Sequence, residues 1–558
     1  MMDITKSHLF AELEKLSLNS VKSVQDGQML NGLDAYLHVS RPIEAVLQAK
    51  MEEIDNSGGG IVLLIGIAGD GKSHLLSRMK EKFDWSQESY YNDATASCSP
   101  NKTAVATLKE ALVDFSDKVI ETTSRKLVLA INLGKLNAFI EDEDVNSKYS
   151  EIVKATKGIF DDDDTTDEIE TDRIKIVLFA KEQMFEIYPD GEQEYPVEAK
   201  FLSGILEKIV NGDENNPFRK AYLADAEDEF ASLNPILLNY KILESPSVRD
   251  SIVKIIIEAI VRFKLIITPR EFLDFIYSIM VYRSPEPYEE KRDFFKALLP
   301  TLLFGGGENL IQKSVSHLDP VVCSSTRHDS LLAELFTSYA IPQRLRDEMV
   351  DARMPDQLLE RVDVFYSNNG RDIEATTKFV FRLWHILDYH SESAVYTAFM
   401  SLLARVLNKQ DDAYLQIYEL VSRTIPRHFG SFTENDHMIP INVQGGKYKL
   451  FASINLAPQE IITQFDPSHP SRFPTSFYLK WKVGEKDVKL KVDYQLFEYL
   501  CGLDQGRLVT SYENDKNLVF NNFVRDLATR ANLDEITILK CDGTHRNLKN
   551  TFGSVRFS

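Results

Sequence analysis

The chain contains a glycine-rich segment between a buried strand and a helix, and this order of elements constrains the fold more than any other feature. Residues 61–65 are Ile-Val-Leu-Leu-Ile, an aliphatic run typical of a strand that is covered on both faces. The segment Gly66–Ser73 follows with the spacing G-x-x-x-x-G-K-S, and residues 74–79 have helical composition. A strand, a glycine loop and a helix in this order predict a phosphate-binding loop in a parallel α/β sheet.

The chemistry of this segment follows from the residues that it contains. Its three glycines let backbone N–H groups approach a phosphate, and the helix that follows adds the positive end of its dipole. We expect the Lys72 ammonium to contact the β- and γ-phosphates and the Ser73 hydroxyl to bind Mg²⁺. The predicted cofactors are therefore ATP and Mg²⁺. The candidate nucleotide-binding residues are Gly66, Gly69, Asp70, Gly71, Lys72, Ser73 and His74.

Hydrophobic periodicity divides the chain into four regions. Residues 1–57 are predicted to be helical, with Ser40 as the N-cap of a helix that has Pro42 in its first turn. Residues 58–200 alternate strands with helices, and this alternation predicts a parallel sheet with both faces covered. The strands are expected at residues 61–65, 88–94, 127–131 and 174–179.

The second half of the chain has a different pattern. Residues 201–436 are predicted to be almost wholly helical, and Thr268-Pro269-Arg270-Glu271 has the cap, the proline and the acid of a helix start. Beyond residue 437 the apolar period becomes two, which predicts a β-rich domain over residues 437–558. The predicted fold is an α/β P-loop NTPase of AAA+ or ASCE type, followed by a helical lid or docking region and a C-terminal mixed α+β domain.

Composition narrows the class of protein. The chain of 558 residues is 43% hydrophobic and 27% charged, and its apolar runs are shorter than the ~20 residues that cross a bilayer. Its four cysteines form no C-x-x-C pair, so neither a zinc site nor a disulfide framework is expected. The N-terminal residues lack the apolar core of a secretory signal. We therefore expect a cytoplasmic protein without a membrane span.

Charge is unevenly distributed along the chain. The total formal charge is −21, but residues 437–558 hold 16 lysines and arginines against 13 acids. Two predicted strands in this part carry Lys480, Lys482, Lys486, Lys489 and Lys491. Flexible cations on one face of a strand pair suit DNA phosphates, so these five lysines are candidate DNA contacts. The alternative is an edge hairpin whose lysines prevent aggregation.

The predicted site departs from the usual ATPase pattern at one position. A hydrolysing P-loop protein ends a second strand with an acid that supports Mg²⁺, whereas the strand at 127–131 is followed by Asn132, which is neutral and cannot act as a base. Asp93 ends the neighbouring strand and is a candidate for the missing carboxylate and Mg²⁺ ligand, although it could equally cap a turn. In the other two interpretations, Asn132 senses the γ-phosphate while the acid lies elsewhere, or the site binds nucleotide and hydrolyses it slowly.

Arginines in the helical region are further candidates. Arg270 heads a predicted helix, and in ATPases with a helical lid an arginine there can reach the γ-phosphate and report its loss. The alternative is an ordinary surface arginine. Arg219 and Arg249 are candidates for an arginine finger supplied across a subunit contact. The candidate catalytic residues are Lys72, Asp93, Asn132 and Arg270.

Several segments together are similar to one known family. They are Leu37–Glu44, the loop Gly66–Ser73 with the three residues after it, Asn92–Thr95, Ser99–Ala104 and Leu129–Asn137. Their combination resembles DptF, a family of DNA phosphorothioation-dependent restriction proteins. The likeness is dense over residues 30–140 and thinner near residues 216–218 and 269–277.

The resemblance implies a role in bacterial or archaeal defence. Members of this family act beside the partner proteins DptG and DptH, and the complex attacks DNA that lacks the host's phosphorothioate mark. This chain would be the P-loop ATPase subunit, with DNA reached through the complex and a homo-oligomer left open. Two alternatives remain: a nucleotide-binding structural subunit without turnover, and a P-loop ATPase that remodels proteins.

Overall fold

The computed structural model of the chain divides into two compact units. Unit 1 comprises Met1–Glu186 and Glu198–Glu392, and unit 2 comprises Ile187–Val197 and Ser393–Ser558. The finer division into four domains stays a prediction. The structure describes residues 6–18, 32–92, 104–160, 169–188, 197–227, 234–284, 286–323, 326–338, 340–367, 373–391, 393–428, 438–441, 448–454, 456–459, 465–483, 485–508, 517–540, 544–551 and 554–557.

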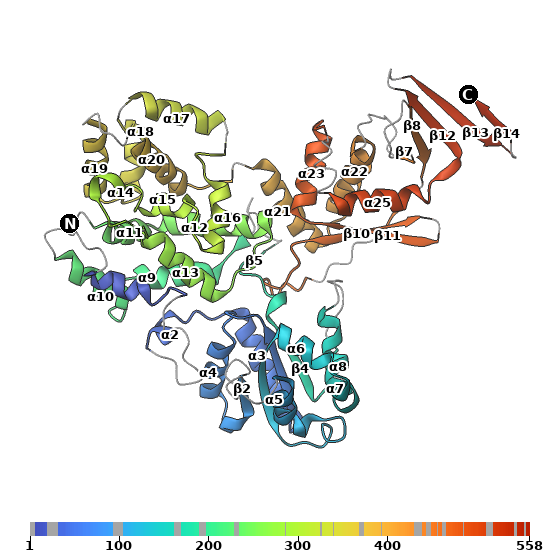
Figure 1. Cartoon of the computed structure of the whole chain (residues 1–558), viewed down its shortest axis with the longest axis horizontal. Coiled ribbons are helices and arrows are strands. Elements are labelled where there is room, and N and C mark those ends of the chain that lie inside the picture. Colours follow the sequence, from blue (N-terminus) through green and yellow to red (C-terminus); the bar gives the residue numbers. More distant parts are fainter. Residues whose placement is uncertain are drawn as a thin grey trace. The chain divides into compact units, whose positions relative to one another are not determined.

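Four parallel strands form the main sheet of unit 1 (Figure 1). They are β1 (Gly60–Gly66), β2 (Tyr90–Asn92), β3 (Lys126–Asn132) and β4 (Ile174–Leu178). Their order is β2-β3-β1-β4, so β1 is internal and pairs on both sides. Every residue of β1 is buried, as the unbroken aliphatic run predicts. These observations confirm an α/β fold with a parallel sheet.

Helices cover both faces of this sheet (Figure 1). Val62 and Leu64 of β1 share one hydrophobic core with α3 and α4, whereas Ile61, Leu63 and Ile65 share another with the helices of the opposite layer. Alternation of buried side chains along β1 therefore fixes the strand between two helical layers. The helices are α3 (Pro42–Ser57), α4 (Lys72–Lys82), α5 (Ala104–Ala111), α6 (Leu133–Ile140), α7 (Glu143–Lys148) and α8 (Ser150–Lys157).

Two local predictions in this region are corrected by the structure. Ser40 does not cap α3. Pro42 occupies the first helical position, so Arg41 is the N-cap, and its guanidinium makes no cap bond because it can only donate hydrogen bonds. The Ser40 hydroxyl instead lies 3.4 Å from Glu44 Oε2. Strand β2 begins at Tyr90 rather than at residue 88, because Gln87–Ser89 form a 3₁₀ turn.

Apart from the ends of two short strands, the rest of unit 1 is mainly helical over the residues that the structure describes, as predicted. Helix α13 begins with a full capping box, in which the Thr268 hydroxyl accepts the Glu271 N–H and the Glu271 carboxylate accepts the Thr268 N–H. The helices are α1 (His8–Glu14), α2 (Gly32–Leu37), α9 (Lys200–Val210), α10 (Pro217–Ala226), α11 (Pro235–Leu243), α12 (Pro246–Phe263), α13 (Pro269–Met280), α14 (Glu290–Asp293), α15 (Leu299–Phe304), α16 (Leu310–Val315), α17 (Thr326–Ser338), α18 (Gln343–Asp351), α19 (Asp356–Ser367) and α20 (Ile373–Leu387).

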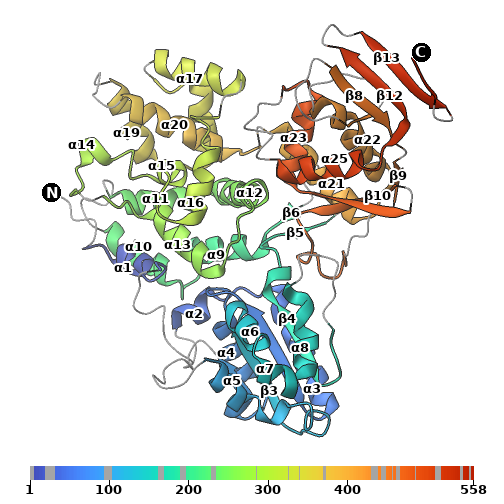
Figure 2. The same cartoon turned by 45° about the vertical axis from the view of Figure 1, so that its right-hand side comes forward.

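Unit 2 combines helices with antiparallel sheets (Figure 2). Its helices are α21 (Ala394–Leu407), α22 (Asp411–His428), α23 (Tyr494–Asp504) and α25 (Leu518–Ala528). One sheet has the order β14-β13-β12-β8-β7 and another has the order β11-β10-β9. The strands are β7 (Met438–Pro440), β8 (Tyr448–Ser453), β9 (Ala457–Pro458), β10 (Phe477–Val483), β11 (Lys486–Val492), β12 (Asn532–Lys540), β13 (His545–Thr551) and β14 (Ser554–Phe557), and the short pair β5 (Glu186–Ile187) and β6 (Val197–Glu198) lies where the two units meet in sequence.

A helix that crosses a membrane must be both long and apolar. Among the helices in the described ranges, none is both long enough and apolar enough to cross a bilayer.

Candidate functional site

The glycine-rich loop lies between the internal strand β1 and helix α4. Gly69 and Gly71 have φ angles of 91° and 92°, in the left-handed region that side chains disfavour. Gly66 is required for another reason, because a Cβ there would overlap Asp70 Oδ2 and lie 2.9 Å from Phe179 Cδ2. The three predicted glycines therefore serve two distinct needs, backbone conformation and close packing.

The Asp70 side chain is buried and bonds the backbone of the loop in which it lies. It is only 8% exposed, and its Oδ2 accepts the Ile67 N–H at 2.5 Å. Burial raises the pKa of the Asp70 carboxyl, although the nearby charges of Lys72 and Arg41 act in the opposite direction. We predicted Asp70 as a nucleotide-binding residue. Its carboxylate is turned toward the loop's own backbone, so any ligand contact would come from its main chain.

Lys72 and Ser73 begin helix α4. The Lys72 ammonium donates to the Ile67 carbonyl at 2.5 Å, so it reaches back across the loop. The Ser73 hydroxyl accepts a hydrogen bond from Asn92 Nδ2 at 2.8 Å, and Asn92 is the last residue of β2. The carboxyl end of β2 therefore reaches the hydroxyl predicted to bind Mg²⁺. Asp93 follows Asn92 directly and lies outside the described residues.

Asn132 ends β3 beside the start of the loop. The parallel register pairs it with Gly66. Its side-chain oxygen accepts the Gly134 N–H at 2.9 Å, so it is the N-cap of α6. The structure thus gives Asn132 a local structural role at the strand end where an acid was expected.

Helix α13 begins against the loop. A Cβ built on Gly69 would lie 2.9 Å from Thr268 Oγ1 and 3.4 Å from Arg270 Cβ. The Arg270 guanidinium donates to the Leu18 carbonyl at 3.3 Å. Residues far apart in sequence are therefore brought to one place, and the predicted helix start lies against the predicted phosphate loop. By contrast, Arg249 caps the end of α11 through the carbonyls of residues 243 and 244.

Arg41 is a site residue that the sequence argument missed. Its Nη1 donates to the Asp70 carbonyl at 2.8 Å, and its guanidinium lies 5.3 Å from the Phe179 ring and 5.4 Å from the Phe201 ring. Burial lowers the pKa of Arg41. A lone cation just before a predicted helix gives no signal that it contacts a loop further along the chain.

His74 contacts a second histidine from the segment before α3. His38 Nδ1 and His74 Nε2 are 2.9 Å apart, so one ring donates and the other accepts, and the rings stack at 5.1 Å. His38 Nε2 also lies 3.4 Å from Glu44 Oε2, and Lys82 binds the other oxygen of Glu44 at 3.0 Å. This chain of contacts joins the first turn of α4 to the segment that carries Arg41.

The histidine pair predicts a pH-dependent stability. Burial, with the charges of His38 and Arg78, lowers the pKa of His74 from 6.5 to about 4, and burial also lowers that of His38. A group with a depressed pKa binds protons more readily when unfolded, so stability should fall as the pH drops from 6.5 toward 4. In thermal melts over this range, His74→Gln should show a weaker dependence on pH than the wild type. Equal slopes would contradict this assignment, and the exposed His390→Gln is the control.

Metal-binding groups are sparse around the loop. Within the described ranges, no three histidine, cysteine, aspartate or glutamate side chains gather closely enough to hold a metal ion. The predicted ligand Ser73 lies at the start of α4, whereas the predicted ligand Asp93 is outside those ranges. A Mg²⁺ site here would be completed by phosphate oxygens and water, as is usual for this ion.

Comparison with known proteins identifies no relative. No family model, no curated protein and no solved structure matches the chain. The function of the chain is therefore inferred from the residues of the loop and from the resemblance seen in the sequence.

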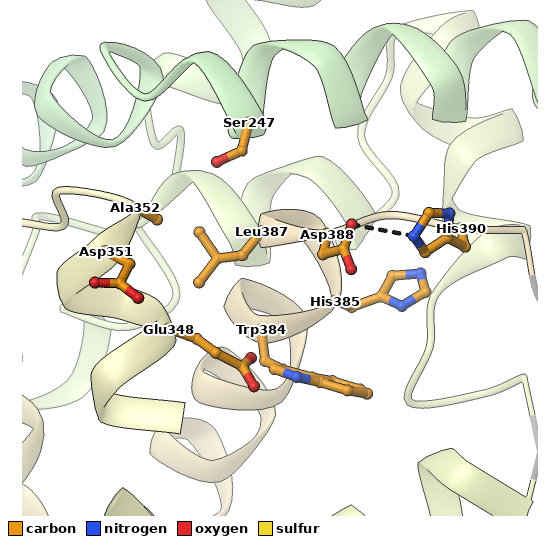
Figure 3. A pocket seen from close by; sticks show the side chains of 9 residues that line it. All are labelled: Ser247, Glu348, Asp351, Ala352, Trp384, His385, Leu387, Asp388 and His390. Atoms are coloured by element: carbon orange, nitrogen blue, oxygen red, sulfur yellow. Dashed lines mark ion pairs between the residues drawn. The ribbon is translucent and has the colours of Figure 1, made fainter. Parts of the chain in front are cut away.

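A cavity with a volume of about 480 Å³ lies in the helical part of unit 1 (Figure 3). Asp388 and His390 form an ion pair of 3.1 Å at its edge. None of the predicted site residues lines it. Its lining residues are Ser247, Glu348, Asp351, Ala352, Trp384, His385, Leu387, Asp388 and His390.

Proposed function

We propose that this chain binds Mg-ATP in the Gly66–Ser73 loop and hydrolyses it, as the P-loop ATPase subunit of a multi-protein complex that restricts DNA lacking phosphorothioate. The observation that carries the nucleotide part is the loop itself, an internal parallel strand followed by left-handed glycines and a helix that begins at Lys72. The restriction role, and the partners DptG and DptH, are supported by the family resemblance alone.

The residues of the loop suit a triphosphate for physical reasons. Lys72 already bonds a carbonyl of the loop, and it can exchange that partner for phosphate oxygens by rotating its flexible stem. The first N–H groups of α4 have no partner within the helix and carry its positive end. When bound, Mg²⁺ would neutralise charge on the β- and γ-oxygens, and Ser73 is the side chain that would hold it.

The bond between Asn92 and Ser73 favours Asp93 as the missing acid. It ties the carboxyl end of β2 to the hydroxyl predicted to bind the metal, and Asp93 is the next residue in the chain. Asn132, next to Gly66 in the sheet, would then orient water or sense the γ-phosphate. Arg270 at the start of α13 stays a candidate for reporting loss of the γ-phosphate.

Substitution of Asp93 and of Asn132 tests which residue supplies the missing acid. Asp93→Asn should lower the rate of phosphate release about 100-fold, while ATP still binds in the absence of Mg²⁺. Asn132→Asp keeps an acceptor for the Gly134 N–H, so α6 stays capped, and it should not restore activity to Asp93→Asn. The rates are measured with purified protein by a coupled phosphate assay. Full activity in Asp93→Asn would show that the acid lies elsewhere.

A nucleotide-binding subunit without turnover is the second candidate. It is favoured by one observation, the neutral Asn132 at the strand end, whose oxygen is already engaged in capping α6. Absence of phosphate release from the chain alone, and from the chain with DptG, DptH and unmodified DNA, would select this candidate. Stimulation of release by DNA and not by unfolded protein would count against a protein-remodelling ATPase.

A further inference from the structure

Strands β10 and β11 of unit 2 form a hairpin with one lysine-rich face. Alternation along the strands places four lysines on this outer face, while Leu479, Trp481, Val488 and Leu490 point inward and are at most 3% exposed. A slip of one residue would expose that buried row, so the lysines are fixed outward. We define the lysine face as Tyr478, Lys480, Lys482, Asp487, Lys489 and Lys491.

Charges on the lysine face are arranged unfavourably for an isolated sheet. Lys480 is directly opposite Lys489 across the antiparallel pair, and such like-charged pairs are destabilising. Lys482 is opposite Asp487, and the Lys491 ammonium lies 5.3 Å from the Tyr478 ring. The face as defined therefore carries four lysines and one acid, a formal charge of +3 that is complementary to a polyanion.

Protection of an exposed strand edge does not account for this face. Strand β10 is internal, with β11 on one side and β9 on the other. The Lys480 backbone is bonded on the β9 side too, since its carbonyl accepts from Gln459 N–H at 2.9 Å and its N–H donates to the Tyr418 hydroxyl at 3.1 Å. Only the lysines of β11 lie on an edge strand of this sheet, so edge protection does not explain Lys480 and Lys482.

We propose that the lysine face binds the phosphate backbone of double-stranded DNA. Protein interfaces are depleted of lysine and centre on aromatic or apolar anchors, whereas DNA-binding surfaces are strongly positive. The only aromatic residue on this face is Tyr478, which lies beneath the Lys491 ammonium. Lysines at alternate positions are ~6.8 Å apart along a strand, which equals the rise of B-DNA along its axis over about two base pairs. Lysine is a point charge without the planar fork that reads bases, so the binding is independent of sequence.

Lys486 supplies a matched control for this proposal. It was grouped with the other four lysines from the sequence, but the register pairs it with Val483, so it belongs to the opposite side of the hairpin and is exposed at its turn. Lys482→Ala and Lys486→Ala remove the same side chain from the same hairpin. The first should weaken binding to a duplex of arbitrary sequence about three-fold or more, and the second by less than about two-fold.

The decisive experiment uses the full chain and fluorescence anisotropy with a 30-base-pair duplex at several salt concentrations. With four phosphate contacts, the slope of log affinity against log salt should be about −3.6, and in Lys480→Ala/Lys482→Ala/Lys489→Ala it should be near −1, with affinity lowered at least about ten-fold at low salt. The triple variant Lys480→Gln/Lys482→Gln/Lys489→Gln keeps part of each side-chain stem but removes the charge. It checks that the loss of DNA affinity is electrostatic. Thermal melts should show no loss of stability in either variant.

Four results would overturn the proposal. The first three are wild-type binding that does not depend on salt, unchanged binding by the triple variant, and equal effects of the Lys482 and Lys486 substitutions. The fourth is displacement of the duplex by poly-glutamate at equal charge, which would indicate an acidic protein partner. The inference does not depend on nucleotide binding. Lys72→Ala should bind DNA as the wild type does, so failure here and failure of the proposed ATP site are distinguishable.

Discussion

Replacing Lys72 by alanine is expected to lower the affinity for Mg-ATP about 100-fold or more. The ammonium is held 2.5 Å from the Ile67 carbonyl, at the mouth of the loop where a triphosphate would lie. A hydrogen bond to a charged group contributes roughly 1.5–3 kcal/mol, and Lys72 is expected to contact two phosphates. Each 1.4 kcal/mol changes affinity about ten-fold. Titration calorimetry with Mg-ATP gives the dissociation constants directly.

Lys80→Ala is the matched control for this experiment. Lys80 is in the last turn of α4 and its ammonium lies 5.6 Å from the Tyr90 ring, so its loss removes a charge from the same helix at the end away from the loop. We expect its affinity for Mg-ATP to stay within about two-fold of the wild type. Equal affinities in Lys72→Ala and the wild type would refute the nucleotide site itself.

Gly66→Ala is expected to destabilise unit 1 by about 3 kcal/mol or more. The backbone there is not left-handed, so the cost is steric and not conformational. The new methyl group would overlap Asp70 Oδ2 and crowd the Phe179 ring, which forces Asp70 to give up its bond to the Ile67 N–H. Overpacking costs ~1–3 kcal/mol, and loss of a hydrogen-bond partner by the buried Asp70 carboxylate adds ~1–3 kcal/mol. The measurement is the midpoint of the thermal unfolding transition.

Gly32→Ala separates this effect from the general consequence of adding a methyl group. Gly32 begins α2, and a Cβ built there meets nothing within 4 Å. Because alanine favours helix, this variant should melt at or slightly above the wild-type temperature. A Gly66→Ala protein that melts like Gly32→Ala would show that Asp70 and Phe179 can move aside at little cost.

The elements that could be predicted are those with a strong local signal. The aliphatic run at 61–65 is found as a fully buried strand, and Thr268–Glu271 is found as a capping box. Helix α21 (Ala394–Leu407) lies within residues 201–436, which the apolar period predicted to be helical. Local pattern decides such elements because burial and capping act within a few residues.

Contacts between distant segments could not be predicted from a single sequence. Arg41 reaches Asp70, and Thr268 reaches Gly69, only because the fold brings those segments together. The face of Lys486 depends on strand register, which the run of lysines does not reveal. The passage of residues 187–197 into unit 2 likewise has no local signal. In each case the information lies in tertiary packing.

The close approach of α13 to Gly69 has a mechanical consequence. A single added carbon atom on Gly69 would touch Thr268, so no free space separates the turn of the loop from the first residue of a helix that is anchored by Phe272, Phe275 and Ile276. Close-packed interfaces do not deform gradually. A shift of the loop by a fraction of an ångström must therefore either displace helix α13 as a unit or be opposed by the packing of that helix. The contact between Gly69 and Thr268 thus couples the position of the glycine loop to the first turn of α13.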